Sequence, residues 1–131
     1  MKTFRIVMLS VVAAVGLFAL QAQQPPTVHR KIMYKQDMSM PGHEGVMALV
    51  ELPPGAAEGR HTHFAEVFAF VQEGEITLEN EGQPTTTLRA GDVFHIAPGA
   101  IHQAINNGTT TAKLAAVFVA EKGKPLTTQV K

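Results

Sequence analysis

The stretch GAAEGRHTHFAEVFAFVQEG, residues 55–74, decides the fold of this chain. Glycines bound it, and small and bulky apolar residues alternate from Val67 to Val71. A period of two is typical of a β-strand, because successive side chains point to opposite faces of a sheet. His61 and His63 are also two residues apart, so on a strand both imidazoles lie on one face. Two neutral imidazoles on one face are the start of a metal site, whereas such a pair alone is more often a chance surface feature.

Short apolar segments continue on both sides of this stretch. Pro-Gly, Glu-Gly and Asn-Asn-Gly sequences separate them, and these residues favour tight turns because Gly adopts positive φ and Pro fixes φ. Closely spaced short strands predict a β-sandwich or β-barrel. We expect strands over residues 28–36, 46–52, 66–72, 75–80, 85–89, 92–97, 101–106 and 112–120.

Two of these strands are apolar at nearly every position: VMALVEL (46–52) and LAAVFVA (114–120). Continuous apolar segments indicate strands that are buried on both faces. The chain after Glu121, KGKPLTTQVK, is polar and is expected to form an exposed end.

The first 22 residues have the pattern of an export signal. Lys2 and Arg5 precede an apolar segment of 15 residues, which is short for a membrane-spanning helix of about 20 residues. Ala22 then offers a small residue at the cleavage position. We therefore expect a signal peptide over 1–22, a single mature domain over 23–131, and a periplasmic or secreted protein. An uncleaved signal anchor is the alternative.

The composition excludes several classes of function. The chain of 131 residues has 11 Lys+Arg and 11 Asp+Glu, so its formal net charge is zero. This balance excludes the basic surface on which nucleic-acid binding depends, and we expect no membrane association once the signal is removed. The chain has no cysteine, which excludes disulfides, thiolate metal ligands and a cysteine nucleophile.

A second stretch, GDVFHIAPGAIHQAIN (91–106), repeats the order of turn, strand, turn and histidine, and ends with His102. The two stretches resemble the two conserved motifs of the cupin superfamily. Only 16 residues separate them, as in compact microbial single-domain cupins, and the resemblance spans about residues 28–120. It implies an all-β fold, an antiparallel jelly-roll β-barrel. It also implies a homodimer formed by exchange of N-terminal strands, here around residues 28–36.

The resemblance implies a divalent metal inside the barrel, held by two histidines and a glutamate of the first motif and one histidine of the second. Residue by residue, His61 and His63 match the first pair, and His102 matches the third histidine. The glutamate usually follows the second histidine by four residues, where this chain has Val67; Glu66 stands one residue earlier.

A shift of one residue on a strand turns a side chain to the other face. A regular strand therefore predicts that Val67 faces the metal and that Glu66 faces away. A β-bulge at residues 64–66 would turn Glu66 inward and make it the fourth ligand. His95, on the strand before the Pro-Gly turn, either packs among apolar side chains or supports the metal ligands as a hydrogen-bond partner, fourth ligand or proton carrier.

Three histidines leave open positions on a metal, which is typical of reactive sites. Without cysteine, the donor set suits Fe, Mn, Ni, Zn or Cu. A site of three histidines resembles the thiol and diketone dioxygenase branches of the cupins, so oxygen chemistry on a small-molecule substrate is the leading expectation. The alternatives are a non-catalytic cupin that binds or senses a metal or small molecule, and a structural barrel with a degenerate site.

Overall fold

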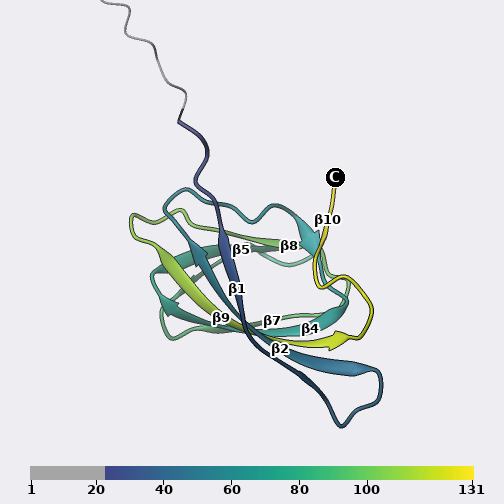
Figure 1. The fold of residues 1–131 in the computed structure, drawn as a ribbon. Coiled ribbons are helices and arrows are strands. Elements are labelled where there is room, and N and C mark those ends of the chain that lie inside the picture. Colours follow the sequence, from purple (N-terminus) through teal and green to yellow (C-terminus); the bar gives the residue numbers. More distant parts are fainter. Residues whose placement is uncertain (1–22) are drawn as a thin grey trace, which may run out of the picture.

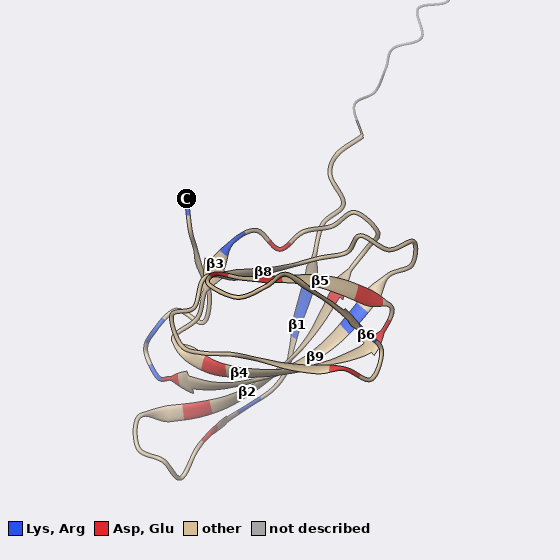
Figure 2. Cartoon of the chain, turned by 180° about the vertical axis from the view of Figure 1, so that it is seen from behind, with Lys and Arg blue, Asp and Glu red and all other residues tan. Residues whose placement is uncertain are grey.

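The structure, a computed structural model, describes residues 23–131. The predicted export signal lies outside the described residues. Within the described part of the chain, no helix is long and apolar enough to cross a membrane. Acidic and basic residues are interspersed along the strands and loops of both sheets (Figure 2), in line with the balanced charge of the sequence.

The described residues form ten strands in two antiparallel sheets, which lie one above the other in Figure 1. The first sheet has the order β1 (His29–Asp37), β2 (His43–Leu52), β9 (Ala112–Glu121), β4 (Ala65–Glu73) and β7 (Val93–Ile96). The second has the order β10 (Thr128–Gln129), β3 (His61–Thr62), β8 (His102–Ile105), β5 (Glu75–Asn80) and β6 (Thr86–Arg89). Because the chain passes repeatedly between the sheets, neighbouring strands are mostly distant in sequence. The predicted all-β jelly-roll is confirmed.

Gly74 forms one of the corners at which the chain changes sheets, between β4 and β5. Its φ is +72°, a left-handed conformation that favours glycine. A Cβ at this position would lie 3.0 Å from the backbone of Thr111 and Ala112. A larger residue would therefore push apart the end of β4 and the start of β9.

The inner faces of the sheets form the core. Alternate residues of β2 and β9 are buried, and the two strands pair over all ten residues from His43↔Glu121 to Leu52↔Ala112. The prediction that these strands are buried on both faces is wrong, because their other faces carry Met47 and Val117 at the surface. No third layer of the described chain covers that side of the sheet.

Strand β4 is regular near residues 64–66, where the sequence allowed a β-bulge. Its pairing with β9 runs without interruption from Ala65↔Ala120 to Val71↔Leu114, and the register shifts only between Val71 and Glu73. Val67 is consequently buried on the inner face, and Glu66 points to the outer face.

The chain after Glu121 does not form a free end. Strand β10 pairs with β3, with Thr128 opposite Thr62 and Gln129 opposite His61. Leu126 is partly buried against the core. The side chains of this segment are nearly all exposed, as predicted, but its backbone completes the second sheet.

Candidate metal centre

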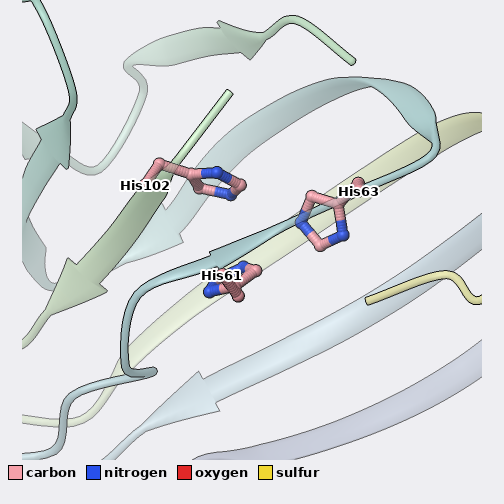
Figure 3. A group of neighbouring side chains, drawn as sticks. All are labelled: His61, His63 and His102. Atoms are coloured by element: carbon pink, nitrogen blue, oxygen red, sulfur yellow. The ribbon is translucent and has the colours of Figure 1, made fainter. Parts of the chain in front are cut away.

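Three imidazoles converge inside the barrel (Figure 3). His61 lies in β3, His63 directly follows it, and His102 begins β8. The only β3–β8 register pair places His61 directly opposite His102. The ring centroids are 4.3, 4.8 and 4.9 Å apart, and one nitrogen of each ring lies within 4.8 Å of the others. In the described part of the chain, these three residues form the one cluster with the geometry to hold a metal ion.

Each of these histidines is oriented by a backbone carbonyl. The Nδ1 atoms lie 2.7 Å from Gly59 O in His61, 2.7 Å from Leu126 O in His63, and 2.9 Å from Ala100 O in His102. A carbonyl oxygen can only accept, so each Nδ1 carries the proton and donates it. In the neutral imidazole, each Nε2 then keeps its lone pair, which is the form in which imidazole binds a metal.

Burial favours the uncharged form of two of the three histidines, His63 and His102. The three side chains are 2–6% exposed, and desolvation lowers the pKa of His63 to about 4. The pKa of His102 is also lowered, mainly by desolvation, although its hydrogen bond to Ala100 O partly opposes this effect. Neutral imidazoles at physiological pH are the donors that divalent Fe, Mn, Ni, Zn and Cu accept. The residues therefore fit such a metal.

The histidines line an internal cavity of about 70 Å³ whose other walls are mostly apolar. The inner faces of both sheets supply these walls, with Val67, Ala69, Ile96 and Phe118 among them. A water molecule needs at least about 10–15 Å³ of such space. The cavity therefore has room for a metal ion with a few waters or a small ligand.

Glu66 and His95 lie on the opposite side of the same sheet. They are partners to each other, since the Glu66 carboxylate bonds His95 Nε2, and both side chains are about half exposed. His95 also stacks on Phe68, with ring centroids 5.0 Å apart. The structure therefore does not bring Glu66 to the histidine cluster, nor does it place His95 behind the ligands.

Glu58 also lines the cavity, from the loop before β3, although no sequence motif pointed to it. Its side chain is 10% exposed, and its Oε2 lies 3.9 Å from His61 Nε2. An acidic residue three positions before the histidine pair could have suggested a further ligand. Whether its side chain points into the cavity depends, however, on the conformation of the loop. Leu126 and Thr127 were also missed, because they reach the cavity only through the folded C-terminal segment.

Comparison with known proteins places this architecture in a family. No curated protein matches the sequence. Among solved structures, similar chains include DMSP lyase DddQ from Ruegeria pomeroyi DSS-3 (18% identity, TM-score 0.66, covering 79% of this chain and 51% of that one). A recombinant oxalate oxidase in complex with glycolate has 22% identity and a TM-score of 0.66, covering 81% of this chain and 56% of that one. The present chain thus spans about half the length of these two enzymes, and at such identities the likeness concerns the fold.

A third similar structure is an uncharacterized conserved protein with a double-stranded β-helix domain from Klebsiella pneumoniae. It has 19% identity and a TM-score of 0.67, and the match covers 84% of this chain and 90% of that one. The family comparison matches residues 48–118 to the cupin domain. This range is more than half of the chain and contains all three buried histidines, so the protein belongs to the cupin family.

Proposed function

We propose that this cupin binds one divalent transition metal through His61, His63 and His102 and uses it in oxygen chemistry on a small molecule. One observation carries the proposal: three buried imidazoles have their Nδ1 protons tied to backbone carbonyls and their Nε2 lone pairs free. A structural role for the barrel would not need three neutral histidines at one point in the core.

When bound, the metal supplies open coordination positions at which dioxygen and a substrate donor atom can meet. The residues of this chain orient the metal-binding imidazoles and line the cavity. The backbone carbonyls hold the imidazoles in a fixed orientation, and most of the other residues that line the cavity are apolar. A low-polarity lining strengthens the electrostatic interactions inside the site.

The cavity also limits the substrate class. A volume of about 70 Å³ admits a molecule of a few heavy atoms rather than an extended aromatic one. The few polar groups at the wall include Glu58, Arg30 and Thr127. We therefore propose a small, polar or anionic substrate whose polar end reaches the metal.

Elemental analysis of the natively purified protein, followed by oxygen-uptake measurements, tests this function. We expect close to one transition metal per chain and substrate-dependent oxygen uptake with at least one member of a panel of small acids, thiols and diketones. Protein with no bound metal after loading with Fe, Mn, Ni, Zn or Cu would contradict the metal site.

A non-catalytic cupin that binds or senses a small ligand is the second candidate. It is favoured by the small size and mostly apolar lining of the cavity, which offers few groups for acid–base chemistry. Full metal loading and tight ligand binding, with no oxygen uptake and no product across the panel, would support this candidate over the enzyme.

We also propose that the protein is exported to the periplasm or beyond. The basic start, the short apolar segment and Ala22 support this location. N-terminal sequencing of the protein from a cell fractionation should give a first residue near Gln23 in the exported fraction. Recovery of the chain from the cytosol with Met1 retained would contradict it.

We also propose that the protein forms a homodimer. The outer face of the first sheet exposes Phe68, Phe70, Val93 and Val117, which lie around one shallow groove. All nine residues of β1, at the edge of this sheet, are exposed as well. Contiguous apolar surfaces of this kind are typical of interfaces. Analytical ultracentrifugation should give the mass of two chains, and Phe68→Glu should shift it towards one; a wild-type monomer at all concentrations would contradict the dimer.

A further inference from the structure

We infer that Glu58 supplies a carboxylate ligand to this metal centre, from the loop before β3, while Val67 holds the strand position where a glutamate would stand. The inference rests on the proposed metal binding. It assigns a fourth protein donor to a site in which the strand register leaves only three.

The backbone around Glu58 is fixed against β8. Glu58 N donates to Ala104 O at 3.0 Å, and Ala57 forms a β-bridge with Ile105. On the same side, Gly55 N donates to Asn106 O, and Asn106 N donates to Ala56 O, both at 2.8 Å. The loop therefore continues the second sheet and holds Glu58 as firmly as a strand residue, beside the strand that begins with His102.

The Glu58 carboxylate is at ligand distance from His61, one of the three histidines of the cluster. Two atoms that each lie about 2.1 Å from one metal are about 3.0 Å apart at a right angle and about 4.2 Å apart on opposite sides. The 3.9 Å between Glu58 Oε2 and His61 Nε2 falls within this range. Both side chains line the same cavity.

The carboxylate is held with one oxygen towards the cluster. Glu58 Oε1 accepts from Arg30 Nη2 at 3.2 Å, and Oε2 accepts from Ala104 N at 3.0 Å. An oxygen with one such partner has a further lone pair to offer. A buried anion needs compensating charge. Arg30 supplies part of it at Oε1, and a metal held by the histidines would supply more.

The competing explanation is that Glu58 only holds Arg30 and the loop. Glu58→Gln separates the two, because the amide oxygen can still accept from Ala104 N or Arg30 while the negative charge is lost. Arg30→Gln is the companion variant. If Glu58 serves only Arg30, the two variants should have similar effects on metal binding; if Glu58 is a ligand, Arg30→Gln should leave binding unchanged or tighten it, because a neighbouring cation is removed.

Zn(II) affinity of the full mature chain, measured by competition with a chelator, tests the inference. We expect Glu58→Gln to bind Zn(II) at least about 10-fold more weakly than wild type. Glu66→Gln, which removes the same charge on the outer face, should stay within about 2-fold. Adding Val67→Glu to Glu58→Gln should restore much of the lost affinity, because a carboxylate returns to the cavity from β4. The melting temperatures of the metal-free variants report whether the fold is intact.

The absorption spectrum of the Co(II)-substituted protein gives a second readout, because d–d bands follow the number and type of ligands. We expect Glu58→Gln to change these bands and Arg30→Gln to leave them nearly as in wild type. If Glu58→Gln binds Zn(II) like wild type while His61→Ala does not, the inference is wrong and the three-histidine site stands. If the wild-type protein binds neither metal, both are wrong.

Discussion

The two faces of strand β4 carry opposite chemistry within a few residues. The inner face presents Val67 and Ala69 to the cavity that the three histidines line. The outer face presents Glu66 and Phe68 to the surface, next to His95. Because side chains alternate along a strand, the register of a single residue decides whether a carboxylate belongs to the metal site or to the surface.

The histidines on the two sides differ in the same way. His63 is buried, and desolvation lowers its pKa to about 4, so it is a neutral donor. His95 is half exposed and forms a hydrogen bond with the Glu66 carboxylate. Residue type alone does not distinguish the two sides, whereas burial and a backbone carbonyl at Nδ1 do.

The largest effect should come from removing the inner pair. His61→Ala combined with His63→Ala takes two of the three imidazoles from the cluster, and we expect the bound metal to fall from about one per chain to near zero. His95→Ala, the outer-face control, should keep full occupancy. Elemental analysis after gel filtration measures both; equal occupancy in the two variants would contradict the inner site.

Placing a carboxylate on the inner face should have opposite effects with and without metal. Val67→Glu buries a charge among apolar side chains, so we expect the metal-free protein to lose on the order of 3 kcal/mol of unfolding free energy. Bound to metal, the new carboxylate is a ligand, and affinity should rise about 10-fold or more. Chemical denaturation and metal titration measure the two effects.

Gln72→Glu is the matched control, since it adds a carboxylate at an exposed position of the same strand. It should change neither stability nor affinity appreciably. If Val67→Glu weakened metal binding without unfolding the protein, residue 67 would not face the metal.

The pH dependence of the metal-free protein should report the inner histidines. Because the pKa of His63 is about 4 in the folded state and about 6.5 when unfolded, the unfolded chain binds more protons between these values. The free energy of unfolding should therefore have its full value above pH 6.5. It should fall by on the order of 2–3 kcal/mol as the pH approaches 4. His102, whose pKa is also lowered, adds to the fall.

Denaturant titrations between pH 4 and pH 7 measure this slope. His63→Gln should make it shallower, because this variant lacks the buried imidazole. A stability that increases as the pH falls would contradict neutral histidines in the core.

The smallest effect is expected on the outer face. Glu66→Gln removes the charge that faces His95, and a half-exposed pair of this kind contributes about 1 kcal/mol or less. Metal affinity should stay within about 2-fold of wild type. A loss of 10-fold or more in a metal titration would show that the carboxylate of Glu66 reaches the metal after all.

Most of the fold could be predicted from the sequence because turn residues mark the ends of the longer strands. The eight expected strands correspond to eight of the ten that the structure describes, within a few residues at the ends. The other two, β3 and β10, have two residues each. Such short strands have no period to recognise, and their pairing depends on long-range contacts. The exposure of Met47 was missed because an apolar sequence does not tell whether a second layer covers it.

The histidine cluster could be predicted because motif spacing carries it, whereas the acidic residues could not be settled from the sequence. From the sequence, the Glu66 side chain could point outward on a regular strand or inward at a bulge. Only the pairing of β4 with β9 distinguishes these two directions. Glu58 lies in a loop, where no period fixes the direction of a side chain. Its place beside His61 follows from the hydrogen bonds between that loop and β8.

The contact between His63 Nδ1 and the carbonyl of Leu126 has a consequence for how the protein is made. The partner of a ligand from the middle of the chain is synthesised more than sixty residues later, and β10 must then pair with β3 to hold it. The ribosome has therefore released almost the whole domain before the centre is complete. An affinity tag fused directly after Gln129 would lie beside His61, because Gln129 pairs with it.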